Sequence, residues 1–71
     1  METLGQRISK LRKEKGLTQI QLAVQLNVTD KAISRWETGK NYPDIEIFED
    51  LSNVFDVSIS ELLEGKRIEK E

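Results

Sequence analysis

Helix-start signals recur along the whole chain and leave little room for any element other than short helices. Three segments, Thr3–Gln6, Thr18–Gln21 and Ser58–Glu61, have the form of a capping box, in which the first and last side chains satisfy backbone N–H groups at a helix start. Thr29 and Asp44 are also of residue types favoured at the N-cap position. These five starts are separated by short turns, so no stretch remains for a β-sheet. The sequence therefore predicts an all-α fold of five helices.

Apolar residues follow each start signal at the spacing expected for one buried helix face. The first predicted helix runs from the Thr3 cap to a stop at Gly16, and the next two occupy Gln19–Leu26 and Asp30–Thr38. The fourth and fifth helices follow the last two start signals. The side chains expected to face the core are Leu4, Ile8, Leu11, Leu22, Ala23, Leu26, Ile33, Trp36, Ile45, Phe48, Leu51, Phe55, Leu62 and Leu63.

The apolar content falls away near the C-terminus, where the chain reads EGKRIEKE from Glu64 onward. We therefore expect one compact domain over residues 1–64 and a charged tail or linker over 65–71. A chain of 71 residues buries only about 60% of its unfolded surface, and this one has no cysteine for a disulfide. Helix packing, caps or a partner chain must therefore stabilise it.

The residue types needed for common catalytic and metal chemistry are missing or scattered. The chain has no histidine and no cysteine, which removes thiol nucleophiles and imidazole-based acid–base or metal chemistry. The acidic residues of 44–64 form no paired constellation, and there is no glycine-rich phosphate loop. No apolar run approaches the roughly 20 residues needed to cross a bilayer. We expect a cytoplasmic protein that is not an enzyme and holds no metal or cofactor.

The net charge of −2 hides a strong asymmetry along the chain. Residues 1–40 contain eight Lys or Arg against four Asp or Glu, whereas residues 41–71 contain three against nine. Such asymmetry is typical of a protein that turns one face toward phosphate and another away from it. Charges that serve only solubility would give the same count, so charge alone does not decide between the two.

The second and third predicted helices form a helix-turn-helix arrangement. Gln19–Leu26 and Asp30–Thr38 are joined by a short turn in which Val28 plugs into the core. Ile33 and Trp36 are three residues apart and bury one face of the later helix. The opposite face presents a polar stripe able to read base edges in a major groove, although any amphipathic surface helix leaves such a stripe outside. The stripe consists of Asp30, Lys31, Ser34 and Arg35.

Several short motifs, spread over about residues 3–63, occur together in this chain. They are Leu17-Thr18-Gln19, Leu22-Ala23, Val28-Thr29, Ile33-Ser34-Arg35-Trp36-Glu37, Gly39-Lys40 and Pro43. In this combination the sequence resembles the phage-repressor helix-turn-helix family, which is the lambda repressor and Cro type, also called Xre-type. The resemblance implies a compact, lambda-repressor-like domain whose third helix enters the major groove, usually in a two-fold dimer.

The resemblance also implies two sets of DNA contacts. Gln19, at the start of the second helix, falls on a phosphate-binding position, which suits its amide and the helix N-terminus. Lys40 and Asn41 fall where the family clamps the sugar–phosphate strand, and Thr38 offers a hydroxyl or a main-chain N–H to the same strand. Thr29 could also contact the DNA backbone. The base-reading positions are Thr29, Asp30, Lys31, Ser34 and Arg35.

One architectural interaction is implied as well. The family pairs the positions of Arg12 and Glu37 as a partly buried ion pair between the first and third helices. Such a pair would fix the orientation of the recognition helix. The alternative is two separately solvated charges.

The sequence departs from the family pattern at three positions. Asn27 and Asp56 stand where the family often has glycine, and both residue types adopt left-handed backbone at some cost. Asp30 places a carboxylate near the DNA, where it could accept from cytosine N4 and act against most other sequences. Its role could equally be limited to compensating the helix dipole in the first turn.

An aliphatic pair lies outside the predicted core. Ile20 and Val24 lie on the face of the second helix opposite Leu22 and Leu26, where the family usually carries polar residues. Exposed aliphatic side chains often have no role. This pair could also bind a protein partner.

We therefore expect a sequence-specific DNA-binding transcriptional regulator, in the first instance a repressor, that reads the major groove with the helix over residues 30–38. One recognition helix reads too few base pairs to select a single genomic site, so we expect a homodimer on a pseudo-palindromic operator. Its contact surface carries Val57, Ile59 and Leu63, although most of that apolar area is needed for the core. The alternative function is an antitoxin or other protein-interaction module built on the same fold.

Overall fold

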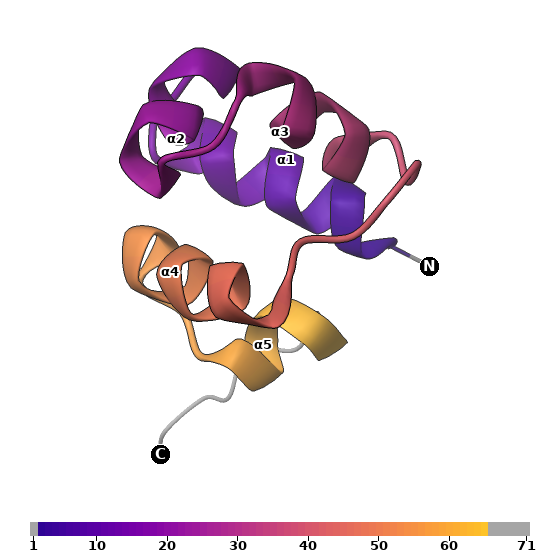
Figure 1. Ribbon diagram of the computed structural model, residues 1–71. Coiled ribbons are helices and arrows are strands. Elements are labelled where there is room, and N and C mark those ends of the chain that lie inside the picture. Colours follow the sequence, from indigo (N-terminus) through magenta and orange to yellow (C-terminus); the bar gives the residue numbers. More distant parts are fainter. Residues whose placement is uncertain (1, 66–71) are drawn as a thin grey trace.

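Five helices make up the part of the chain that the computed structural model describes, residues 2–65 (Figure 1). No strand occurs within those residues, so the all-α prediction is confirmed. Apart from Gly65, the tail predicted over 65–71 lies outside the described residues. The helices are α1 (Leu4–Glu14), α2 (Gln19–Leu26), α3 (Asp30–Glu37), α4 (Ile45–Phe55) and α5 (Ile59–Glu64).

The starts of α1 and α2 follow the local signals of the sequence. At α1, Thr3 Oγ1 accepts from the N–H of Gln6 at 3.1 Å, and Gln6 Oε1 accepts from the N–H of Thr3 at 2.9 Å. Thr18 and Gln21 form the same reciprocal pair at α2, with distances of 3.0 and 2.8 Å. Both predicted capping boxes are therefore confirmed, and each satisfies two backbone donors that the helix leaves unpaired.

At the starts of α4 and α5, only part of the predicted capping is present. Ser58 Oγ accepts from the N–H of Glu61 at 2.9 Å, which is one half of the predicted capping box. Asp44 holds the N-cap position of α4 with extended backbone, but its side chain makes no capping hydrogen bond. The expected Asp44 cap is thus wrong as a hydrogen bond. The carboxylate still lies at the positive end of the helix dipole, where a negative charge is favourable.

Residues with left-handed backbone follow all five helices of residues 2–65, and Gly65, with a φ of 74°, is the one after α5. Asn27 and Asp56 have φ angles of 57° and 56°, so both substitutes for glycine adopt the conformation that the pattern requires. Gly16 and Gly39, with φ angles of 69° and 78°, follow α1 and α3. The third helix ends at Glu37, one residue before the predicted end, with Thr38 as its C-cap.

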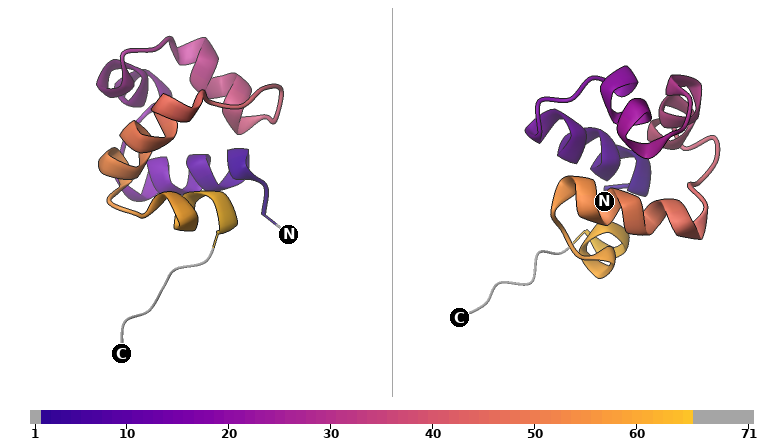
Figure 2. Two further views of the ribbon diagram at one scale, coloured as in Figure 1. Left: turned by 60° about the horizontal axis from the view of Figure 1, so that its bottom comes forward. Right: turned by 60° about the vertical axis from the view of Figure 1, so that its left-hand side comes forward.

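The helices pack in two groups around one core. In Figure 1, α1, α2 and α3 lie together and α4 and α5 lie beneath them, and the left view of Figure 2 shows α5 alongside α1 and α4 facing α2. All five helices contribute buried apolar side chains. Burial of one large apolar side chain stabilises the fold by about 1.5–3 kcal/mol. Leu4 and Phe48, also expected in the core, are half-buried and pack against it. The fully buried set is Ile8, Leu11, Leu22, Ala23, Leu26, Ile33, Trp36, Leu51, Phe55 and Leu62.

Two residues expected in the core are exposed. Ile45, the first residue of α4, is 84% exposed, and Leu63, in the last turn of α5, is 52% exposed. Both lie at helix ends, where the apolar spacing fits two neighbouring faces and only the packing partner decides which face is buried. Leu51 and Phe55 set the buried face of α4, and Leu62 sets that of α5.

The backbones of α1 and α3 approach each other at Gly5. A Cβ atom added to Gly5 would overlap the carbonyl oxygen of Trp36 and lie 2.8 Å from that of Glu37. Glycine costs about 0.5–1 kcal/mol within a helix, and here it permits a contact that any side chain would block. The sequence signals only the capping box around Gly5, not this contact.

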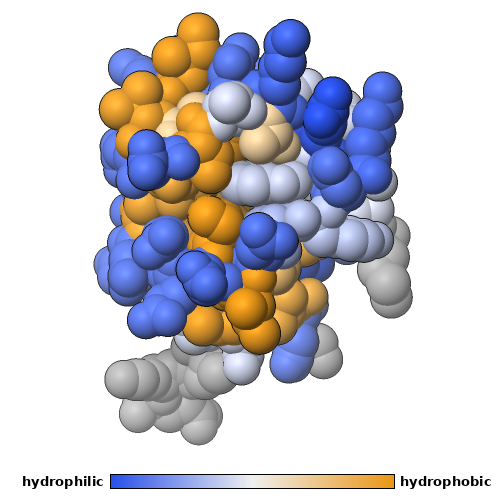
Figure 3. Space-filling model, in the orientation of Figure 1, coloured by the Kyte–Doolittle hydropathy of each residue, from blue (hydrophilic) through white to orange (hydrophobic). Residues whose placement is uncertain are grey.

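The outer surface has an apolar band and no membrane-spanning element. Ile20 and Val24 are 63% and 75% exposed, so the prediction that this pair lies outside the core is confirmed. Figure 3 shows hydrophobic side chains gathered in a band over α2 and α4 on one face of the molecule. Within residues 2–65, every helix is too short or too polar to cross a bilayer.

Candidate nucleic-acid interface

The predicted helix-turn-helix unit is formed by α2, the turn over residues 27–29 and α3. Val28 is half-buried and packs against the core, as the sequence predicts. Thr29 is the N-cap of α3, and its Oγ1 accepts from the N–H of Ala32 at 3.1 Å. A hydroxyl that accepts a hydrogen bond keeps its own hydrogen to donate, so the Thr29 side chain can cap the helix and still donate to a base or a phosphate.

The outer face of α3 carries the polar stripe expected from the sequence. Ile33 and Trp36 are buried on the inner face, at 0% and 7% exposure. Asp30, Lys31 and Arg35 are exposed on the other side, and Ser34 is half-buried. The stripe therefore combines cations, a carboxylate and a hydroxyl, which together can donate to and accept from base edges.

A shallow hollow joins this stripe to the loop that follows α3. It has a volume of about 230 Å³. Both Lys40 and Asn41 of the loop are exposed, and the N–H of Lys40 donates to the carbonyl of Arg35 at 2.9 Å, which holds the loop against the helix. Predicted base-reading and phosphate residues are thus brought to one place. The hollow is lined by Lys31, Ser34, Arg35, Thr38 and Lys40.

Thr38 is already engaged within α3. Its hydroxyl donates to the carbonyl of Ser34 at 2.8 Å, and its main-chain N–H donates to the same oxygen at 3.0 Å. A phosphate contact by Thr38 would have to replace one of these two hydrogen bonds. The residue can shape the hollow without contributing a free donor.

Gln19 is held by a partner that the sequence does not reveal. Its Nε2 atom donates to Glu37 Oε1 at 3.1 Å, and the side chain is half-buried. One hydrogen of the amide remains, and the main-chain N–H groups of Gln19 and Ile20 are among those that a helix start leaves unpaired. The start of α2 can therefore donate to an anion, as the phosphate prediction requires.

Arg12 and Glu37 form an ion pair between α1 and α3. Arg12 Nε lies 2.7 Å from Glu37 Oε2, and Arg12 Nη2 lies 3.1 Å from Glu37 Oε1. The side chains are only 11% and 7% exposed. The hydrogen bond to Glu37 raises the pKa of Arg12 above its ordinary value, against the opposing effect of burial. Arg12 Nη1 also donates to the carbonyl of Leu17 at 2.8 Å, so this guanidinium ties α1 to α3 and to the start of α2.

A second buried arginine was not predicted. Arg7 is 9% exposed, and its Nη1 donates to the carbonyls of Leu62 and Leu63 at 2.6 and 3.2 Å, which closes the end of α5. Its Nε also pairs with Glu2 at 3.2 Å. The two carbonyls that accept from Arg7 belong to residues more than 50 positions away from it in the chain. No local pattern could have indicated them.

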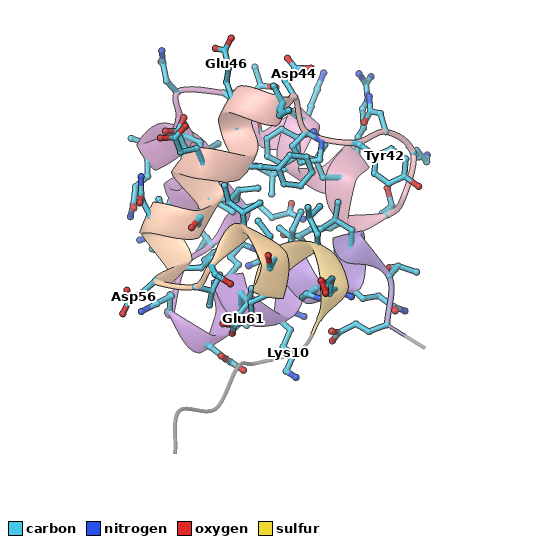
Figure 4. The ribbon with its side chains drawn as sticks, turned by 90° about the horizontal axis from the view of Figure 1, so that it is seen from below. Lys10, Tyr42, Asp44, Glu46, Asp56 and Glu61 are labelled. Carbon is cyan, nitrogen blue, oxygen red and sulfur yellow. The ribbon has the colours of Figure 1, made fainter. Side chains whose placement is uncertain are left out.

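Charge separates the two groups of helices. Residues 41–65 contain seven Asp or Glu and no Lys or Arg, and six of the seven acids are exposed. Figure 4 shows Asp44 and Glu46 of this acidic part on the side of the molecule opposite Lys10 of α1. Within residues 2–65, no cluster of three or more His, Cys, Asp or Glu is placed to hold a metal ion. Because residues 41–65 contain no Lys or Arg, the exposed cations of the described residues lie on α1 and its C-cap, on α3 and in the loop after α3.

Comparisons with known proteins agree with this geometry. The helix-turn-helix family matches residues 8–62. The chain is 48% identical over 64 residues to the HTH-type transcriptional activator BcrR of Enterococcus faecalis, covering 90% of this chain and 31% of that protein. It is 39% identical over 64 residues to the HTH-type transcriptional regulator SinR of Bacillus subtilis, covering 89% and 58%. The chain thus spans about a third to three fifths of the length of these relatives.

A solved structure gives the same result for the fold. The P22 c2 repressor protein in complex with a synthetic operator superimposes with a TM-score of 0.88 at 32% sequence identity. The match covers 93% of this chain and all of that one. The arrangement of five helices is therefore shared with a repressor that has been seen on DNA.

Proposed function

Because the chain belongs to the helix-turn-helix family of the phage-repressor type, we propose that residues 2–65 form the operator-reading domain of a transcriptional regulator. The observation that carries this proposal is the hollow on α3. It gathers Lys31, Ser34 and Arg35 beside Lys40, while Ile33 and Trp36 bury the opposite face. A helix with one buried face and one donor-rich face can enter a major groove without disturbing the core.

Sequence recognition is assigned to the outer face of α3. Arg35 can present two parallel donors to O6 and N7 of guanine, and Lys31 can donate to the same edge of a neighbouring base pair. The hydroxyls of Ser34 and Thr29 can each donate or accept a hydrogen bond. Asp30 accepts from cytosine N4 where that base is present and repels phosphate elsewhere, so it acts against most competing sequences.

Register on the duplex is assigned to contacts on both sides of α3. Gln19 offers its remaining amide hydrogen and the start of α2 to one phosphate, and Glu37 holds the amide in position at 3.1 Å. Lys40 and Asn41 bind the strand on the other side of α3. We further propose that the Arg12–Glu37 pair keeps α3 at a fixed angle to α1, so that all these contacts are made together.

Two copies on a pseudo-palindromic site would supply the selectivity that one recognition helix lacks, with half-sites about 34 Å apart. Val57 is half-buried, and Ile59 and Leu63 are 42% and 52% exposed. More apolar area is free at this end of the domain than the sequence predicts, which supports a contact between copies there. Asp56 and Glu64 beside it oppose close approach, so DNA or a further segment of the chain would hold the pair together.

Repression is the proposed output, because occupation of an operator is sufficient for it. A second function, binding of a protein partner, is favoured by the exposed pair Ile20 and Val24 on α2. This surface lies outside the set of residues assigned to DNA. A protein-interaction module would use it in place of the α3 face.

Selection of bound sites from a random duplex pool tests the proposal. We expect one enriched motif with two symmetric half-sites, whose affinity falls steeply with salt. Lys40→Ala should lower the slope of log K against log salt by about one unit, whereas Gln19→Ala should weaken binding without changing the slope. A pool that enriches no motif, together with salt-independent binding, would favour the protein-interaction function instead.

A further inference from the structure

A groove along α1 is not used by any of the contacts proposed above. It has a volume of about 610 Å³ and is bounded on its other side by Glu37 of α3. The α1 residues that line it recur at one-turn intervals, so the groove follows that helix for about 10 Å. Its lining consists of Gln6, Ser9, Lys10, Lys13, Glu14 and Glu37.

Hydrogen-bond donors dominate the α1 side of the groove. Lys10 and Lys13 are exposed cations, and Ser9 adds a hydroxyl. Gln6 accepts from Thr3 through Oε1, which leaves its NH₂ group as the part available to a ligand. Cations and neutral donors in one row suit an extended anion.

The two carboxylates of the groove do not cancel this character. Both oxygens of Glu37 already accept hydrogen bonds, from Arg12 at 2.7 and 3.1 Å and from Gln19 at 3.1 Å. Its charge is therefore compensated within the protein. Glu14 has an interaction of its own. Lys13, and Lys10 in part, remain to meet an anion, against at most one carboxylate.

Glu37 also connects the groove to the proposed phosphate site. One side of this residue lines the groove, and Oε1 holds the Gln19 amide at the start of α2. Lys13 lies in the last turn of α1, at the end that leads into α2. A DNA strand that leaves Gln19 in the direction of α1 would therefore meet Lys13 first.

We propose that the α1 groove binds the DNA backbone beyond Gln19, with Lys13 as the phosphate contact and Ser9 and Gln6 as neutral donors. This inference rests on the proposed function and extends its footprint. Lys10 lies nearby but also lines a hollow of about 40 Å³ with Glu61, so part of its charge is met by α5. Figure 4 shows Lys10 on the side of the molecule opposite Asp44 and Glu46 but close to Glu61 of α5, so Lys13 is assigned as the phosphate contact in preference to Lys10.

Salt dependence of binding to a duplex with two half-sites tests this assignment. Lys13→Gln should lower the slope of log K against log salt by about 0.9, because one condensed counterion fewer is released. Between 50 and 200 mM salt, the variant should thus lose about 3.5-fold less affinity than the wild type. The same change should appear with a duplex of random sequence, since phosphate contacts carry no sequence information.

Lys15→Gln is the matched control. It removes the same charge two residues away, but Lys15 is the C-cap of α1 and lines a different hollow with Phe55 and Asp56. We expect its slope to stay near that of the wild type. Ethylation interference adds an independent readout: phosphates whose ethylation weakens wild-type binding should include one that leaves Lys13→Gln unaffected.

Three results would overturn the groove assignment. They are an unchanged slope for Lys13→Gln, equal decreases for Lys13→Gln and Lys15→Gln, and a groove that binds inorganic phosphate while the DNA slope of Lys13→Gln stays at the wild-type value. Lys40→Gln separates this failure from that of the proposed function. If Lys40→Gln lowers the slope and Lys13→Gln does not, α3 still reads DNA and only the groove is wrong. If the wild type shows no salt-dependent binding, both proposals fail.

Discussion

The group α1–α3 and the pair α4–α5 use their polar side chains in opposite ways. In the first group, Arg12, Glu37 and Gln19 connect three helices through hydrogen bonds of 2.7 to 3.1 Å. On α4 and its N-cap, four exposed carboxylates make no hydrogen bond or ion pair with any described residue. These are Asp44, Glu46, Glu49 and Asp50.

This difference shows how a chain with a net charge of −2 can be built to meet DNA. The exposed cations lie on α1, α3 and the loop after α3, and paired charges fix the helices that carry them. Residues 41–65 hold seven acids and no bases, so this part of the surface repels phosphate and disfavours docking in the wrong orientation. The fold is shared by both parts, whereas the proposed reading surface belongs to one.

The ion pair in the first group should give the largest effect on stability. Glu37→Ala leaves the Arg12 guanidinium buried with only the Leu17 carbonyl as partner, so the free energy of unfolding should fall by about 3–5 kcal/mol. Glu2→Ala is the control and should cost below about 1 kcal/mol, because Glu2 is 35% exposed and Arg7 keeps the carbonyls of Leu62 and Leu63 as partners. Denaturant melts measure both. Equal melting curves for Glu37→Ala and the wild type would show that the pair does not organise α1–α3.

The close approach of α1 and α3 gives the next effect. Gly5→Ala places a Cβ against two carbonyl oxygens of α3 and should destabilise the fold by about 1–3 kcal/mol, with a shift of α3 that also weakens DNA binding. Gly16→Ala is the control. It meets no atom within 4 Å and pays only for its left-handed backbone, about 1 kcal/mol, with DNA affinity unchanged once the protein is folded. Loss of DNA affinity in both variants would remove the link between this contact and α3.

Arg35 tests whether the difference between the two groups of helices extends to DNA binding. Arg35→Ala should weaken binding to the selected site by about 1–3 kcal/mol and relax the preference at one base position, because a bidentate contact to guanine is lost. Glu49→Ala, on exposed α4, should leave affinity and preference unchanged. Titration of both variants against site variants measures this. A uniform loss over all sequences would make Arg35 a phosphate contact.

Two equivalent helix ends give the smallest expected effects. Asn27 and Asp56 occupy the same left-handed position after α2 and α4, and neither helix has a basic residue in its last turn. Asp56→Asn removes a negative charge from the negative end of a helix and should stabilise the protein by about 0.3–1 kcal/mol. Asn27→Asp should destabilise it by a smaller amount, because residues 1–40 contain eight Lys or Arg against four Asp or Glu, and their net positive charge offsets part of the dipole effect. Thermal melts at low salt measure both, and equal and opposite shifts would mean that the charge of the surroundings has no influence.

Local signals in the sequence were sufficient to predict where most of the helices begin and end. Thr18 and Gln21 lie three positions apart and bond to each other within one turn, so the start of α2 could be predicted without tertiary structure. The same holds for Asn27, whose tolerance of left-handed backbone is a property of the residue itself. Such signals depend on neighbours in the chain, which the sequence displays directly.

Long-range packing was where prediction failed. Ile45 and Leu63 fit an apolar spacing, but they lie at helix ends beyond the reach of the facing helix. Arg7 looks like any solvated arginine until α5 brings its last carbonyls to the guanidinium. The hydrogen bond from Gln19 to Glu37 likewise joins residues 18 positions apart.

The candidate site was foreseen as a set of residues but not as an arrangement. The outward spacing of Lys31, Ser34 and Arg35 follows from the buried positions of Ile33 and Trp36, which the sequence shows. That Lys40 shares a hollow with them depends on the fold of the loop. The groove beside Lys13 depends on how Glu37 packs against α1. The family resemblance implies the Arg12–Glu37 pair, but it does not imply a groove beside that pair.

The central claim is that α3 and its flanks meet DNA while α4 and α5 face away. Titration of the isotope-labelled protein with a duplex carrying the selected site, followed by backbone amide chemical shifts, tests this residue by residue. We predict shift changes concentrated in α3, at the start of α2 and over residues 38–41, with those of α4 and α5 largely unchanged apart from any contact between copies near Ile59 and Leu63. Changes concentrated along α4, over Asp44–Asp50, with α3 unaffected would contradict the account.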